Sequence, residues 1–120
     1  MEPISPGLLA QDNTLVVYSD FTFATASPLL LRSLSADDIV LNCEVVLATA
    51  FDDAASTLSV GTPVGAEAVM SVDSIAPAYA FQYGTEDNYI APVDETLNLY
   101  INPAASTIGS GYVLLTIRRA

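Results

Sequence analysis

The sequence predicts an all-β protein, an antiparallel β-sandwich of jelly-roll type, from three observations. Apolar residues recur with a period of two through most of the chain, which is the spacing of strands and not of helices. Gly, Pro, Asn and Asp separate the apolar runs, and strands do not alternate with helices. The chain has 120 residues, 52% of them hydrophobic, which is enough to form a single domain with its own core.

The clearest alternation runs from Ile39 to Phe51. This run is more than twice as long as an ordinary strand, so we expect a bend, a bulge or a strand shared between two sheets. Turn residues at 52–56 then lead to the short strand Thr57–Val60, and this spacing predicts a hairpin. The residues of the long strand that are predicted to face the core are Ile39, Leu41, Cys43, Val45, Leu47 and Phe51.

The rest of the chain is read in the same way. Ala66–Ser74 is the one segment predicted as a helix, within an excursion from Gly61 to Tyr79 that is expected to cross between the sheets. Residues 1–13 are predicted to be an extended N-terminal arm, because they precede the first strand and contain two prolines and a glycine, and residues 14–120 form the single domain. Further strands are expected at Thr14–Ser19, Phe21–Thr25, Pro28–Ser33, Tyr79–Tyr83, Thr96–Ile101 and Tyr112–Arg118, with Leu97, Leu99, Ile101, Val113, Leu115 and Ile117 facing inward.

The charge balance excludes several classes of partner. The chain has fourteen acidic residues and only three basic ones, Arg32, Arg118 and Arg119, which gives a net charge of −11. Such a surface repels phosphate, so neither nucleic acid nor an anionic membrane is expected as a partner; a halophilic origin would produce the same acidity. The N-terminal residues resemble neither a signal peptide nor an anchor, and no apolar run approaches about 20 residues. We therefore expect a protein made in the cytoplasm.

The residue types argue against an enzyme. Without His or Lys, the chain has no Ser-His-Asp, Cys-His or Ser-Lys arrangement. Cys43 alternates in phase with Leu41 and Val45, so a core role is predicted for it. Adjacent acidic pairs are candidates for glycoside hydrolysis or for calcium, but solvated turns are favoured, and no cofactor or metal is expected. These pairs are Asp37/Asp38, Asp52/Asp53, Glu86/Asp87 and Asp94/Glu95.

Three groups of residues are candidate contacts. Tyr79, Phe81 and Tyr83 have strand spacing, with Tyr89 nearby, and packing in the core or between subunits is favoured for them over sugar stacking. Arg118 and Arg119 are either solvated or form an ion-pair anchor to a neighbouring subunit. In the N-terminal arm, the apolar anchors are Ile4, Leu8 and Leu9.

The order of these features resembles that of small jelly-roll head decoration (cement) proteins of tailed bacteriophages. In that family a long alternating strand leads into a turn of the type A-F-D-x-x-x-x-x-L-x-V-G-T, which reads here as Ala50 to Thr62. A Tyr-bearing strand follows, here Tyr79–Tyr83, and two final strands are joined by a turn of small residues, here Ala104–Gly111. Asp53 and Ala54 stand where the family's turn has glycine.

The resemblance implies a virion structural protein on the head surface. Its partners would be the major capsid protein, whose subunit junctions it would clamp, and its own copies, as a trimer in preference to a dimer. Many weak contacts repeated over a closed shell would together give a large stabilisation. The alternative left open is a tail or fibre module that binds a receptor or a carbohydrate, because such modules share the sandwich.

Overall fold

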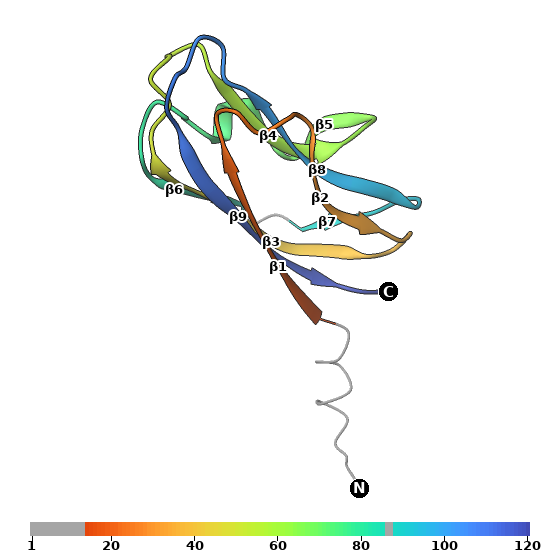
Figure 1. Ribbon diagram of the computed structural model, residues 1–120. Helices are drawn as coiled ribbons and strands as arrows, with labels where there is room; N and C mark the ends of the chain where they lie inside the picture. The colour runs from red at the N-terminus through yellow and green to blue at the C-terminus, as the bar shows by residue number, and fades with distance from the viewer. Residues whose placement is uncertain (1–13, 86–87) are drawn as a thin grey trace, which may run out of the picture.

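The computed structural model describes residues 14–85 and 88–120, and it confirms an all-β sandwich of jelly-roll type. Two antiparallel sheets pack face to face (Figure 1). The five-stranded sheet has the order β1-β9-β3-β6, with β7 also paired to β3, and the four-stranded sheet has the order β2-β8-β4-β5. The strands of the first sheet are β1 (Thr14–Thr22), β9 (Ser110–Arg118), β3 (Ile39–Thr49), β6 (Gln82–Thr85) and β7 (Tyr89–Ile90). Those of the second are β2 (Leu29–Leu34), β8 (Glu95–Asn102), β4 (Thr57–Thr62) and β5 (Gly65–Met70).

The core lies between the two sheets and follows the predicted alternation in the last two long strands. The inward-facing residues of β8 and β9 are buried, as are Cys43, Val45 and Leu47 of β3. Because a strand places successive side chains on opposite faces, each of these strands contributes one face to the core. The residues of β8 and β9 for which this prediction is confirmed are Leu97, Leu99, Ile101, Val113, Leu115 and Ile117.

The expected irregularity of the long strand is confirmed as bulges in β3. Its pairing with β9 shifts register between Val40 and Asn42, and again between Leu47 and Thr49. The first bulge reverses the alternation, because an extra residue moves the following side chains to the other face. The prediction that Ile39 and Leu41 face the core is therefore wrong: both are only half-buried, whereas Val40 is fully buried.

The hairpin predicted at residues 52–56 is also wrong. β3 belongs to the five-stranded sheet and β4 to the four-stranded sheet, so this connection crosses between the layers. Phe51 is buried where the chain leaves β3, and its N–H donates a hydrogen bond to the carbonyl of Pro77 at 2.8 Å. The turn residues predicted a change of direction, but they do not specify in which sheet the next strand finds its partner.

The segment predicted as a helix is mostly a strand. β5 pairs with β4, with Val60 opposite Met70 and Thr62 opposite Gly65, and only Val72–Ser74 form a single 3₁₀ turn. A segment this short is a marginal helix by itself, and β4 offers its backbone groups partners in a sheet instead. The chain then enters β6 in the other sheet, which confirms the predicted crossing.

Other elements also differ from those predicted. β1 continues without interruption to Thr22, so there is no separate strand at Phe21–Thr25. β6 begins at Gln82, three residues after Tyr79, and the two-residue strand β7 was not predicted. The described residues contain no helix long and apolar enough to cross a membrane.

Candidate functional site

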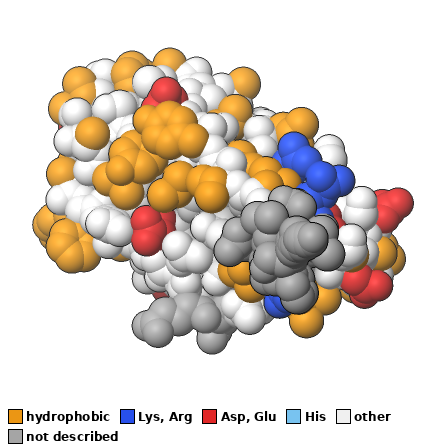
Figure 2. All heavy atoms as spheres, turned by 90° about the horizontal axis from the view of Figure 1, so that it is seen from below, with side chains coloured by type: hydrophobic (Ala, Val, Ile, Leu, Met, Phe, Trp, Pro, Cys, Tyr) orange, Lys and Arg blue, Asp and Glu red, His pale blue; other side chains and the backbone are white. Residues whose placement is uncertain are grey.

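The outer face of the five-stranded sheet, which points away from the core, carries a group of apolar side chains. Strand register brings them together, because Tyr18 lies opposite Leu114 and Tyr112 lies opposite Val46. Val16 and Tyr18 are 64% and 57% exposed. Hydrophobic side chains gather on this side of the molecule in Figure 2, with single acidic groups among them. We call this set, Val16, Tyr18, Val46, Tyr112 and Leu114, the outer patch.

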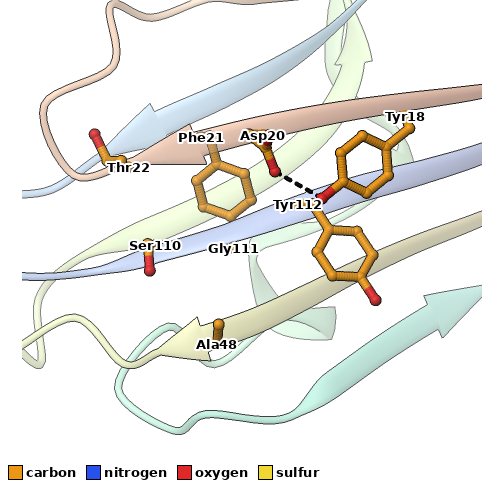
Figure 3. A pocket seen from close by; sticks show the side chains of 8 residues that line it. All are labelled: Tyr18, Asp20, Phe21, Thr22, Ala48, Ser110, Gly111 and Tyr112. Carbon is orange, nitrogen blue, oxygen red and sulfur yellow. Dashed lines mark hydrogen bonds between the residues drawn. The ribbon is translucent and has the colours of Figure 1, made fainter.

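Two tyrosines of the outer patch form its centre. The rings of Tyr18 and Tyr112 are stacked, with centroids 4.9 Å apart. The Tyr18 hydroxyl donates a hydrogen bond to Asp20 Oδ1 at 2.8 Å, and this bond raises the pKa of the Tyr18 hydroxyl. Beside the rings lies an open hollow of about 380 Å³, bounded also by Thr22, Ala48 and Ser110 (Figure 3). The arrangement offers flat aromatic surface next to a carboxylate, and it is suited to contacts with a partner rather than to catalysis.

The aromatic stripe predicted on one strand is divided by the structure. Tyr79 and Phe81 precede β6 and are 69% and 66% exposed. Tyr83 is half-buried, and its single hydroxyl proton is shared between the carbonyls of Ala76 at 2.9 Å and Tyr79 at 3.1 Å. Tyr89 lies opposite Val40, five positions nearer the start of β3 than Val45, the partner of Tyr83, and its hydroxyl donates to Glu95 Oε2. Only Tyr79 and Phe81 therefore offer a freely accessible aromatic surface in this group.

The two C-terminal arginines are exposed and have no ion pair with any other described residue. Arg118 is the last residue of β9 and lies opposite Thr14, on the same face of the sheet as the outer patch. Arg119 follows the end of the strand. The predicted arm anchors Ile4, Leu8 and Leu9 lie outside the described residues.

The pair Asp52/Asp53 holds the loops at one end of the sandwich together. Asp52 accepts hydrogen bonds from the Thr107 hydroxyl and backbone N–H, both at 2.7 Å, and these bonds lower the pKa of Asp52. Asp53 accepts from the N–H groups of Ala55 and Ala105 at 2.8 Å, which lowers its pKa too. Both carboxylates are thus used to tie residues 103–107 to the start of the 52–56 connection.

The other acidic pairs are placed similarly or lie outside the described residues. Asp38 accepts from the N–H groups of Ser35 and Ala120, and Asp94 accepts from that of Ala36. Glu86 and Asp87 are not among the described residues. Within residues 14–85 and 88–120, no three His, Cys, Asp or Glu side chains are grouped so that they could hold a metal ion.

Cys43 lies in the core as predicted, with no exposed surface, and burial raises the pKa of its thiol to about 12. Because the thiolate is the reactive form, we expect this cysteine to be inert while the protein is folded. A maleimide reagent at neutral pH should label the folded chain far more slowly than the chain unfolded in guanidinium. Equal rates in the two states would contradict a core position.

Sequence reasoning missed the outer patch. Its members come from three strands, of which β1 and β9 are about 95 residues apart, and each strand by itself shows only an ordinary alternation. The sequence did contain one signal, because both faces of β1 and of β9 carry apolar residues. Val16 and Tyr18 alternate with Leu15 and Val17, and Tyr112 and Leu114 alternate with core residues. A contiguous group of apolar residues on the solvent face of a sheet, unlike a single one, marks a surface that is available for contacts.

Comparisons with known proteins support the fold assignment. No protein-family model matches the sequence, and no curated protein matches it. A chain of the cyanophage Pam1 capsid asymmetric unit has a TM-score of 0.68 at 21% identity, over 90% of this chain and 86% of that chain. A chain of the acidic stable capsid structure of Helicobacter pylori bacteriophage KHP30 has a TM-score of 0.70 at 12% identity, over 88% and 86%. Since the two coverages are nearly equal in each case, both matched chains are about as long as this one.

Proposed function

We propose that this chain is a virion structural protein that decorates the outer surface of a phage head and stabilises the junctions between capsid subunits. The observation that carries the proposal is the match of the whole fold to chains in two phage capsid structures. The match extends over nearly the full length of chains of similar size, and not over one domain of a larger chain. The order of strands and turns in the sequence supports the same assignment.

The surface of the protein suits a role in assembly. The outer patch, Tyr79 and Phe81 expose apolar and aromatic side chains, which are enriched where proteins meet. The described residues bring together no catalytic group, and both Asp52 and Asp53 are used to hold loops. The proposed partners are the major capsid protein and other copies of this chain, without nucleic acid, membrane or cofactor.

The proposed fastening to the shell is the N-terminal segment of residues 1–13. Burying Ile4, Leu8 and Leu9 in a neighbour would contribute about 1.5–3 kcal/mol each, before the loss of chain entropy is subtracted. A contact of this size is reversible for one copy, and repetition over the lattice makes the whole layer stable. Synthesis in the host cytoplasm, followed by attachment to the head, fits this scheme.

Deletion of residues 1–13 should leave a folded β-sandwich that occupies shells poorly, because the domain keeps its core and loses its apolar anchors. Shells prepared without the protein would be mixed with the full chain or the deletion variant, and bound protein would be measured after sedimentation. The variant Ile4→Ser/Leu8→Ser/Leu9→Ser is the matched control for segment length, and it should bind as poorly as the deletion. Full occupancy by both variants would assign the shell contact to the sandwich instead.

The copy number in native particles tests the function itself. Hundreds of copies on the shell, counted by quantitative mass spectrometry and located by electron microscopy, are expected for a decoration protein. A few copies at the tail tip would overturn the proposal in favour of receptor binding.

A carbohydrate-binding module is the second candidate, and the stacked pair Tyr18 and Tyr112 beside Asp20 favours it. Aromatic faces pack against sugar rings, and a carboxylate accepts hydrogen bonds from sugar hydroxyls. Glycan-array binding that Tyr112→Ala abolishes, while Phe81→Ala, outside the hollow, preserves it, would support this function. Binding that neither substitution alters would exclude this hollow as the sugar site.

A further inference from the structure

The edge of the five-stranded sheet at β1 is open. Among the described residues, β1 pairs with β9 on one side and with no strand on the other. Its nine residues keep an unbroken register with β9, with no bulge, proline or lysine. Natural proteins usually protect such an edge with one of these devices, because a free row of N–H and C=O groups pairs readily with another strand. β1 therefore has the properties of a strand edge at which a strand of another chain can pair.

The register shows which backbone groups are free. The N–H of Phe23 donates to the carbonyl of Gly109 at 2.9 Å, one pair beyond the end of the ladder. Hydrogen-bonded pairs alternate along an antiparallel ladder, so the odd-numbered residues of β1 bond to β9 and the even-numbered ones point outward. Thr22 already bonds to Thr25 through both its N–H and its carbonyl. The outward groups that remain are those of Thr14, Val16, Tyr18 and Asp20.

We propose that two copies of this chain pair through β1, antiparallel and about a twofold axis at Val17. This register places Thr14 opposite Asp20 of the second copy, and Val16 opposite Tyr18 of the second copy. All four outward residues of each copy are then used, in about eight backbone hydrogen bonds, because each hydrogen-bonded pair exchanges two. The Val16–Tyr18 pairs are β-branched and aromatic, a favourable combination across strands.

Charge complementarity favours the same register. Arg118 lies opposite Thr14 on the outer face and is exposed, without an ion pair to any described residue. In the paired copies, Asp20 of the second copy lies on the other side of Thr14 from Arg118, so these three residues form one row across the strands. The Cα atoms of Arg118 and of this Asp20 are then about 10 Å apart. A long arginine side chain reaches a carboxylate across the short threonine. The twofold axis makes this contact twice.

The high net charge does not oppose the contact. Each copy carries −11, but screening limits repulsion to charges within about 8 Å at physiological salt. The nine residues of β1 contain a single acid, Asp20, and the two Asp20 side chains would be separated by about 20 Å along the paired strands. The local charges thus attract.

A second copy satisfies the edge better than other occupants. A strand of the shell, or residues 1–13 of a neighbouring copy, would have to supply both matching backbone groups and a cation for Asp20. β1 with Arg118 supplies both by symmetry, and a twofold contact closes with two copies. The proposed pair joins the outer patches of two copies into one surface, and it is a dimer where the family resemblance favours a trimer.

Cysteine substitution at the axis tests the proposal in the purified full-length chain. In the proposed register, Val17 faces Val17 of the second copy as a non-hydrogen-bonded pair with Cα atoms about 4.5 Å apart, within the range for a disulfide. Mild oxidation of Val17→Cys should therefore convert most of the chain to a covalent dimer on a non-reducing gel. Leu15→Cys is the matched control, because Leu15 is also half-buried on the same face. Two Leu15 positions would be about 13 Å apart in the pair, so this variant should stay monomeric on the gel.

Charge exchange gives a second, independent measurement. Asp20→Arg alone and Arg118→Asp alone should each weaken dimerisation about tenfold or more in analytical ultracentrifugation, because each places two like-charged contacts in the dimer. The double variant should restore it, and Arg119→Asp, beyond the strand, should leave it unchanged. A monomeric full-length chain, or equal cross-linking of Val17→Cys and Leu15→Cys, would overturn the proposal. These measurements involve no shell, so they can fail while decoration still holds, and the reverse also applies.

Discussion

Replacement of Phe51 by alanine is expected to destabilise the fold by about 3–5 kcal/mol. Phe51 is 2% exposed and lies where the chain leaves β3 to cross between the sheets. The backbone of Gly109 lies so close to the ring that an added Cβ would be 2.5 Å from Phe51 Cδ1. The ring therefore packs against the connection between β8 and β9 at this end of the sandwich, and its removal would leave a cavity there.

Guanidinium unfolding measures this loss directly as a lower midpoint with an unchanged slope. Phe81→Ala is the matched control, because Phe81 is 66% exposed, and it should change the free energy of unfolding by no more than about 0.5 kcal/mol. Small domains are stable by about 5–15 kcal/mol in total, so the Phe51 variant would lose a large share. Equal effects of the two substitutions would show that the loops do not depend on this ring.

Replacement of Gly111 by alanine is expected to destabilise the fold by about 3 kcal/mol or more. Gly111 lies in β9 opposite the second bulge of β3, where Leu47 pairs with it and Ala48 is the extra residue. A Cβ on Gly111 would lie 2.1 Å from the backbone oxygen of Val46 and 3.1 Å from the Phe21 ring. Since a backbone atom in a central strand cannot move aside as a flexible side chain can, the pairing of β3 with β9 must shift.

Gly84→Ala is the matched control for this substitution. Gly84 also lies in a strand paired with β3, but a Cβ there would meet its nearest neighbours at 3.6 Å, an ordinary contact. This variant should unfold at nearly the same midpoint as the natural chain. If Gly111→Ala were equally well tolerated, the close approach of β3 and β9 at the bulge would be disproved.

The candidate contact residues were predictable only in part. Tyr79 and Phe81 stood out in the sequence by their spacing, and the structure places both on the surface. Arg118 stood out as one of three cations, but its importance depends on its position opposite Thr14. The stacking of Tyr18 on Tyr112 could not be predicted, because it requires the register of β1 with β9 across most of the chain.

The amino-acid sequence by itself determined the class of the fold and much of its core. A period of two buries alternate residues in any sheet, so the burial of Cys43 and of the inward residues of β8 and β9 followed without knowledge of strand partners. Composition likewise excluded catalysis that depends on His or Lys, because those residues are absent from the whole chain.

The tertiary structure alone decided which strands meet. Residues 57–60 were expected to return onto the long strand, yet they pair with β8 and β5 in the other sheet, and residues 65–70 form a strand because β4 offers them partners. The bulge at Leu41 reversed the faces of Ile39 and Val40. The physical reason is the same in each case: alternation specifies that a strand has two faces, whereas its partner, register and sheet depend on contacts between residues far apart in the chain.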